Sequence, residues 1–320
     1  DTVTVDALPG NTISALRIDN GAILQFSPEV GRLNISRSVR IDPGATLTFP
    51  EISDTTGLNC FSDFVNRGVL VPGHSVIRFA GDSAKSIASE GAVNSFYTLE
   101  IAGNNTSTSG NVTVENDLLL HRSISPGVHD TVIVENPDSS AIQDTGKVLT
   151  GTVRRKIQAG ATGAYRFESP SSYIRFNGSG VYPEHVSITT YPDTSPSNFG
   201  SQWVVVTGIV DPVNNTVTVG DVPPLSKWSF GPPKRTALRR TVGENGPPDR
   251  LVASPVDTVG DPTISRVYVI GGDGPLGFNA QLKLRYDQSE VPVGAAEDSL
   301  RLLRLAPTVM SMVEGWNLIS

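Results

Sequence analysis

Two stretches of the chain are variants of one phrase. Residues 16–26 have the sequence L-R-I-D-N-G-A-I-L-Q-F, and residues 39–49 have the sequence V-R-I-D-P-G-A-T-L-T-F. Most of their apolar residues and their glycines coincide after a shift of 23 residues, as Gly21 and Gly44 show (44 − 21 = 23). A fixed period of about 20–50 residues is typical of solenoids and other repeat proteins. The two stretches are therefore expected to occupy equivalent places in successive turns of one structure.

Apolar residues alternate with other residues within each copy, which is the pattern of a half-buried strand. The Asn-Gly or Pro-Gly step between the two alternating runs favours a turn, because glycine adopts positive φ without steric cost. Two short strands, a turn and a return after 23 residues define one coil of a parallel β-helix. The residues expected to point into the stacked core are Ile18, Leu24, Phe26, Ile41, Leu47 and Phe49.

The solenoid domain is expected to cover residues 1–145 with looser spacing after the two regular copies. Residues 66–79 again contain a strand, a Pro-Gly turn and a strand that ends in phenylalanine, so they are expected to form a third copy. Further strand patterns lie at residues 96–101, 112–114, 118–120 and 131–134. Residues 104–110, N-N-T-S-T-S-G, are expected to form a polar loop because they lack apolar alternation.

The composition fits a protein built from short strands and turns. The chain has 320 residues, of which 38% are hydrophobic, 31 are glycine and 23 are proline. Its net charge of −7 argues against nucleic acid or an anionic membrane as a partner. No apolar run approaches the roughly 20 residues of a transmembrane helix, so no membrane insertion is expected. The one cysteine, Cys60, cannot form an internal disulfide and is expected to be a buried thiol.

The second half of the chain has a different sequence pattern from the first. From residue 146 on, strand-like runs recur about every 10–15 residues with turn residues between them, which is typical of an antiparallel sandwich. We expect one β-sandwich over residues 146–232, a linker rich in proline and glycine over residues 233–250 and a small second sandwich over residues 251–320. The predicted fold class is all-β: an N-terminal right-handed parallel β-helix followed by two antiparallel β-sandwich domains.

Three details of the second half can be checked against a structure. Trp203 and Trp228 are expected to be buried in the first sandwich. The side chains of Leu282, Leu284 and Tyr286 are expected to share one face of a strand because they alternate along the chain. Residues 299–305 are expected to form a strand.

Several phrases, in this order, suggest a family. They are F-Y-T-L-E-I (residues 96–101), V-E-N-D-L-L-L (114–120), G-T-V-R-R (151–155), Y-R-F (165–167), L-S-K-W-S-F-G (225–231), L-K-L-R-Y (282–286), E-D-S-L-R-L (297–302) and G-W-N-L-I-S (315–320). In this order the chain resembles the large secreted surface proteins that gliding-type bacteria export by the type IX pathway. The resemblance implies a multidomain protein with an extracellular or cell-surface location, and it supplies no catalytic motif. The chain opens at Asp1 without a methionine, which predicts a processed form or a fragment.

The sequence predicts no catalytic, cofactor-binding or metal-binding residue. Asp19 and Asp42 recur at the period of 23 and would stack on adjacent coils, as a glycosidase carboxylate pair would require. Their place beside the turns favours hydrogen bonds to turn backbone instead. The four histidines, His74, His121, His129 and His185, lack the spacing of metal ligands and are expected on the surface or in loops. A structural calcium ion is the alternative to no cofactor at all, with Asp257, Asp261 and Asp273 as its candidate ligands.

Two sets of residues are candidates for assembly and modification. Alternating valines at the N-terminal end and an apolar strand at the C-terminal end predict strand addition between copies, through Val3, Val5, Trp316, Leu318 and Ile319. Asn104 and Asn105 lie in glycosylation sequons within the polar stretch and are the candidate acceptors.

These features lead to one functional expectation and two alternatives. The expectation is a non-enzymatic structural or adhesive protein of the extracellular space or cell surface, whose partners are copies of itself, other surface proteins or glycans. The first alternative is the subunit of a self-assembling extracellular filament, joined head to tail by strand addition or coil stacking. The second is a carbohydrate-active β-helix enzyme.

Overall fold

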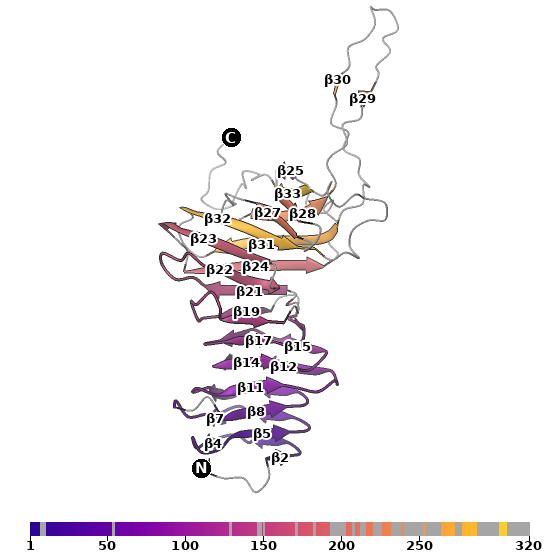
Figure 1. Cartoon of the computed structure of the whole chain (residues 1–320). Coiled ribbons are helices and arrows are strands. Elements are labelled where there is room, and N and C mark those ends of the chain that lie inside the picture. Colours follow the sequence, from indigo (N-terminus) through magenta and orange to yellow (C-terminus); the bar gives the residue numbers. More distant parts are fainter. Residues whose placement is uncertain are drawn as a thin grey trace, which may run out of the picture.

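The computed structural model of the chain is all-β, with no helix among the described residues (Figure 1). The structure describes residues 1–6, 11–52, 55–127, 130–145, 149, 151–169, 172–181 and 184–192, together with Tyr286 and the later strands given below. The N-terminal part is a β-solenoid of about 6 turns, as the 23-residue repeat predicts. Figure 1 shows its strands stacked as rungs between the N-terminus and the antiparallel sheets.

Three strands make up each full turn, and each strand belongs to one of three faces. The first face contains β1 (Thr2–Val5), β4 (Ile23–Phe26), β7 (Thr46–Thr48) and β10 (Val69–Val71), followed by β13 (Asn94–Phe96), β16 (Val112–Val114), β19 (Thr131–Val134) and β21 (Gly151–Lys156). The second face contains β2 (Thr12–Ile13), β5 (Arg32–Ile35), β8 (Gly57–Cys60), β11 (Val76–Phe79), β14 (Thr98–Ile101), β17 (Leu118–Leu120) and β20 (Ile142–Asp144). The third face contains β3 (Leu16–Ile18), β6 (Val39–Ile41), β9 (Phe64–Asn66), β12 (Lys85–Ser89), β15 (Thr106–Ser109) and β18 (Ile124–Ser125). The expectation of two strands per coil is therefore wrong, because it missed strands such as β5.

The two copies of the repeated phrase lie on adjacent turns in the expected register. Ile18 pairs with Ile41 and Leu24 pairs with Leu47 in parallel ladders. The rings of Phe26 and Phe49 stack with their centroids 5.0 Å apart. Of the predicted core residues, all are buried except Leu24, which is partly buried against the core.

Glycine makes the turn between the third and first faces possible. The N–H of Ala45 donates to the carbonyl of Asp42 at 3.0 Å, with Pro43 and Gly44 between them. Gly44 has a φ of 75°, and Gly21 has the same conformation one turn earlier with a φ of 76°. Proline second and left-handed glycine third is the signature of a type II turn. The predicted Pro-Gly and Asn-Gly turns are confirmed.

Residues 66–79 do not form a third copy of the phrase in the same phase. Val69 pairs with Thr46, so the strand before the Pro-Gly step belongs to the first face and the step itself lies at the next corner. The corner before β10 is two residues shorter than its predecessor. The register spacing is 25 residues between Ile41 and Asn66 but 23 between Thr46 and Val69 (66 − 41 = 25; 69 − 46 = 23). Alignment by the turn motif alone therefore placed the copy at the wrong corner.

The polar stretch 104–110 is also not a simple loop, because it contains strand β15. Thr106 and Thr108 point inward and are buried, while Ser107 and Ser109 are exposed. Asn105 precedes the strand with a φ of 53°, a left-handed conformation that asparagine tolerates better than most residues. Buried and exposed side chains do alternate in this stretch. The sequence pattern does not reveal the strand, because the inward residues are threonines and not apolar residues.

Strand β21 joins the solenoid to the antiparallel sheets. It pairs in parallel with β19 on one side and antiparallel with β24 (His185–Pro192) on the other. The sheet continues from β24 through β31 (Ile264–Gly272), β28 (Ser226–Gly231), β33 (Arg301–Leu305) and β25 (Trp203–Val206). A second sheet contains β22 (Ala164–Ser169), β23 (Ser172–Val181), β32 (Gly277–Arg285), β27 (Thr216–Val219) and β26 (Ile209–Asp211). A separate pair consists of β29 (Leu238–Arg239) and β30 (Val252–Ala253).

Strands from the two predicted sandwich stretches pair with each other. Strand β31 pairs with β24 and β32 pairs with β23, although 264–285 lies in the stretch assigned to the C-terminal domain. The predicted linker, residues 233–250, lies outside the described residues except for β29. The strand expected at 299–305 corresponds to β33. The side chains of Trp203 and Trp228 lie outside the described part of the structure, so their predicted burial is untested.

One buried cluster runs through the solenoid and into the antiparallel sheets. It extends from Ile18 near the N-terminus to Tyr286 without division. Leu282, Leu284 and Tyr286 are buried on one side of β32 and its end, as their alternation predicts. Cys60 is a buried free thiol, also as predicted. The solenoid and the first antiparallel strands therefore share one core.

The stacked phenylalanine pair gives a direct test of this core. Replacing Phe49, which is 1% exposed, by alanine should lower the free energy of unfolding by about 3–5 kcal/mol, because it removes the ring and leaves a cavity beside Phe26. Gln25→Ala, at an exposed position of β4, is the matched control and should change it by less than about 0.5 kcal/mol. Denaturant unfolding measures both. Equal losses in the two variants would contradict the stacked core.

Candidate functional site

A buried arginine lies where the solenoid meets the antiparallel sheets. Along β21 the side chains of Val153 and Arg155 face inward, while their neighbours face outward. Arg155 is completely buried, and its guanidinium donates to the backbone carbonyls of Asp138 at 2.6 Å, Arg166 at 3.0 Å and Ser139 at 3.4 Å. It thereby links the last complete turn of the solenoid to strand β22.

The ring of Tyr165 completes the surroundings of this arginine. The guanidinium carbon of Arg155 lies 5.1 Å from the centroid of the Tyr165 ring, within the range of a cation–π interaction. The Tyr165 hydroxyl donates to the carbonyl of Pro137 at 2.9 Å. Burial lowers the pKa of Arg155 to about 10, so the guanidinium stays charged at neutral pH. Burial is also the main cause that raises the pKa of Tyr165.

Charged side chains form a second cluster on the outer side of the same strands. Nε2 of His185 lies 3.2 Å from a carboxylate oxygen of Glu135, and its Nδ1 lies 3.3 Å from a guanidinium nitrogen of Arg154. Nζ of Lys156 lies 3.9 Å from Glu135 and 3.5 Å from Glu184. These contacts tie β19, β21 and β24 together. His185 is only 8% exposed and begins a strand, so the expectation of a surface or loop histidine is wrong for it.

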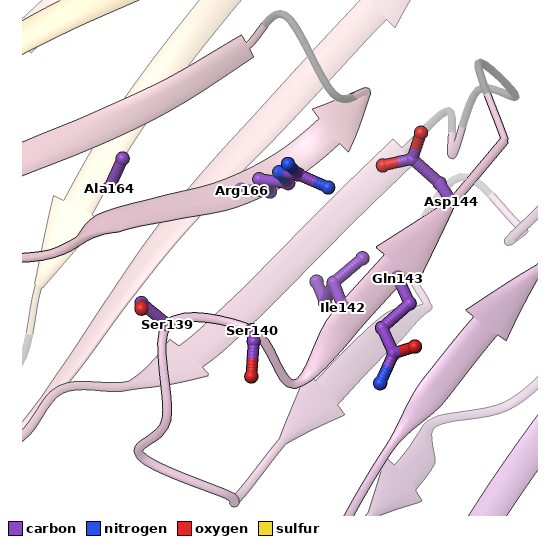
Figure 2. A pocket seen from close by; sticks show the side chains of 7 residues that line it. All are labelled: Ser139, Ser140, Ile142, Gln143, Asp144, Ala164 and Arg166. Carbon is purple, nitrogen blue, oxygen red and sulfur yellow. The ribbon is translucent and has the colours of Figure 1, made fainter.

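A recess of about 610 Å³ opens beside the junction (Figure 2). Its walls come from the corner before β20, from β20 itself and from β22. The lining residues are Ser139, Ser140, Ile142, Gln143, Asp144, Ala164 and Arg166. Figure 2 shows the side chain of Ile142 pointing toward Arg166, with the carboxylate of Asp144 beyond the guanidinium. This recess combines one cation, one carboxylate, an amide and two hydroxyls with a small apolar area.

The carboxylates of Asp19 and Asp42 are held by arginines. Asp42 is 6% exposed and accepts from Nε of Arg40 at 2.6 Å and from Nε of Arg17 at 3.0 Å. Asp19 lies 2.8 Å from Arg17. The hydrogen bond from Arg40 is the largest cause that lowers the pKa of Asp42, and Arg17 adds to it. The expected bonds from these carboxylates to turn backbone are therefore replaced by ion pairs along the third face.

The residues predicted for assembly are only partly described. Val3 is 55% exposed and Val5 is partly buried, both on β1 at the end of the first face. Trp316, Leu318 and Ile319 lie outside the described residues.

The candidate glycosylation residues differ in their surroundings. Asn104 donates from its amide to the Asp82 carboxylate at 2.8 Å, and its carbonyl accepts from Lys85 at 3.0 Å. Asn105 is exposed. Of the two, Asn105 is the accessible side chain.

Neither a metal centre nor a reactive thiol is indicated within the part of the chain that the structure describes. It contains no group of three or more His, Cys, Asp or Glu residues placed to hold a metal ion. The candidate calcium ligands Asp257, Asp261 and Asp273 fall outside it. Burial raises the pKa of the Cys60 thiol, which opposes a thiolate. Nor does the described part include a helix that could cross a membrane.

Sequence reasoning missed two buried cations. Lys85 is 2% exposed and its Nζ donates to the carbonyls of Gly81 at 2.9 Å, Ser83 at 2.7 Å and Asn104 at 3.0 Å. Burial lowers the pKa of Lys85. Side chains alternate between the two faces of a strand, so Arg155, two residues after the inward-facing Val153 of β21, can be expected to face inward as well. Nothing comparable marks Lys85, because its carbonyl partners lie at corners whose geometry the sequence does not show.

Comparisons with known proteins add no family to this description. No protein-family model matches the sequence, and neither the curated proteins nor the solved structures gave a significant match.

The arginine pair around Asp42 predicts how stability depends on pH. Because the folded-state pKa of Asp42 lies below its unfolded value, the pair stabilises the fold above the unfolded pKa, and this contribution is lost as the pH falls through the folded pKa. Asp42→Asn should therefore reduce the loss of stability as the pH falls below the unfolded pKa of aspartate, measured by denaturant midpoints. Glu29→Gln, at an exposed position outside this ion-pair network, is the control and should follow the wild type. Identical pH profiles for wild type and Asp42→Asn would contradict the assignment.

Proposed function

We propose that this protein is a non-enzymatic structural or adhesive protein of the extracellular space or cell surface. In this proposal the solenoid is a stiff stalk, and the antiparallel sheets at its end form β-sandwich domains that present surfaces to partners. The partners are copies of the protein, other surface proteins or glycans. Export by a type IX pathway belongs to the same proposal and rests on the sequence resemblance alone.

The observation that supports this proposal most is the undivided core across the junction. The first face passes from parallel pairing at β19 to antiparallel pairing at β24 through the single strand β21. The buried cluster extends across that point. With about 6 turns and about 4.8 Å per turn, the solenoid is roughly 30 Å long. A rod whose end is continuous with its stalk transmits position and force better than one with a hinge.

The charged residues on the outer faces also favour a structural role. Glu100 on the second face lies within 3.4 Å of Arg32 and within 3.3 Å of both Arg78 and His121. Asp42 is held in the same way by its two arginines. The two arginines lower the pKa of Asp42, whereas the general acid of a glycosidase needs a raised pKa. In this proposal Asp42 and Glu100 therefore serve cross-strand pairing.

An adhesion assay on the full chain tests the proposal. Beads coated with the protein should be retained under flow on surfaces carrying the same protein or neutral glycans, above beads coated with an inert protein. Polysaccharides incubated with the protein should gain no reducing ends. Polysaccharide cleavage that is lost in the folded double variant Asp19→Asn/Asp42→Asn would overturn the proposal in favour of the enzyme.

A second candidate function, a filament subunit, is favoured by the end of the first face. Strand β1 pairs with β4 on one side only and is the last strand of its sheet. Val3 is 55% exposed there, and Val5 and Ile13 are only partly buried. An open strand edge with apolar side chains can accept a strand from a second copy. A contact of this kind that does not close into a ring produces a filament.

Two matched valine variants test the filament. Val3→Lys should abolish polymers seen by electron microscopy and sedimentation, because lysine at a strand edge opposes pairing. Val93→Lys, at a site that is 68% exposed on the solenoid wall, should leave them unchanged. Deleting residues 315–320 tests the C-terminal partner. A strictly monomeric wild-type protein would eliminate this candidate.

A further inference from the structure

The recess beside the junction lies where one sheet ends and its neighbour continues. Strand β20 is the last strand of the second face, whereas the first face continues through β21 into antiparallel pairing. Strand β22 lies beyond β20 without pairing to it in a sheet. The recess of about 610 Å³ opens between these elements, within the size range of about 300–1,000 Å³ of small-molecule sites.

The carboxylate of the recess occupies an unusual position in the solenoid. Asp144 pairs with Leu120 on the strand below it. The positions under it form one column of the second face: Ile13, Ile35, Cys60, Phe79, Ile101 and Leu120. All of these are apolar or a thiol, and all but Ile13 are buried. A carboxylate at the end of this column faces the recess instead of a further turn.

The cation of the recess is available to a ligand. In β22 the side chains of Tyr165 and Phe167 are buried, and Arg166 between them is partly buried on the opposite side, at the recess. Its backbone carbonyl accepts from Arg155, but its guanidinium makes no hydrogen bond or ion pair with any described residue. Arg155 therefore fixes the backbone at the point where the Arg166 side chain enters the recess.

The chemistry of the lining restricts the class of ligand. An anion would be attracted by Arg166 but repelled by Asp144, whereas a cation would be attracted by Asp144 but repelled by Arg166. An apolar ligand would find only Ile142 and Ala164. A neutral polyhydroxyl ligand matches the set, because guanidinium, carboxylate, amide and hydroxyl groups together donate to and accept from its hydroxyls.

We propose that this recess binds a short segment of a neutral oligosaccharide, with the guanidinium of Arg166 hydrogen-bonded to its hydroxyl groups. This inference rests on the proposed adhesive function and names the glycan contact within it. The site is open to solvent and about equally polar and apolar, so we expect weak binding by one protein, with a Kd of about 1 mM, and useful strength only when several copies engage one polymer.

The test uses the full chain, labelled with ¹⁵N for NMR, and four neutral tetrasaccharides: β-1,4-glucan, α-1,4-glucan, β-1,4-mannan and chitin. At least one should shift resonances of residues that line the recess. Arg166→Ala should weaken this binding by about 10-fold or more, since it removes a charged hydrogen-bond donor. Arg37→Ala, at an exposed position of the solenoid that does not line the recess, is the matched control and should bind as the wild type does.

Two further measurements make the result decisive. Ala164→Phe fills the recess without removing a polar group and should also abolish binding, with thermal unfolding used to confirm that each variant is folded. A peptide copying residues 1–6, a strand of this protein, tests whether the open edge of β20 takes a strand instead. Binding of the peptide but of none of the saccharides would overturn the proposal. So would saccharide binding that survives both Arg166→Ala and Ala164→Phe. The adhesion assay is independent, because adhesion that persists in Arg166→Ala would leave the structural role standing and reject only this site.

Discussion

Parallel stacking in register is the constraint on which the rest of this structure depends. Each inward side chain lies against the equivalent residue one turn away, so a whole column must be compatible in size and polarity. One such column of the second face runs through Leu33, Leu58, Ile77, Leu99, Leu118 and Ile142. Asn66 shows how a polar residue can be accommodated in the core at a corner. The buried amide of Asn66 donates to the carbonyl of Val93 at 3.1 Å, and its oxygen accepts from the N–H of Gly68 at 3.0 Å.

The same constraint makes the end of a solenoid its most demanding point, because the last turn has no partner above it. On the first face the last solenoid strand, β21, does have a partner above it, because it pairs in parallel with β19 and antiparallel with β24. Arg155 contributes on the inside, where its donors satisfy carbonyls from the last corner and from β22. The second face ends at β20 instead, and the recess lies at that end. The continuity of the core and the presence of a recess therefore both result from the change from parallel solenoid turns to antiparallel sheets.

The sequence predicts the solenoid well because its evidence is local and repeated. The phrase that recurs after 23 residues predicts the register of Ile18 on Ile41, the turns and the inward residues of its own strands. The strand at Thr106 and Thr108 was missed because its inward residues are polar. The phase of the third copy was missed because one corner is two residues shorter. Arg155 lies in the phrase G-T-V-R-R and contacts Tyr165 of the phrase Y-R-F, yet neither phrase reveals that the carbonyl partners come from residues 138 and 139. Partners that are distant in sequence, such as β24 with β31, leave no local pattern.

The central claim, that the solenoid and the antiparallel sheets form one cooperative structure, can be measured with the protein's own probes. Cys60 is the single cysteine and is buried in the solenoid, whereas all three tryptophans, at 203, 228 and 316, lie in the second half of the chain. Thiol labelling of Cys60 and tryptophan fluorescence should therefore report one coincident unfolding transition in denaturant. Arg155→Met, which leaves buried carbonyls without their donor, should shift both transitions together to lower denaturant. Two separate transitions in the wild type, or a shift of the fluorescence transition alone in the variant, would contradict the claim.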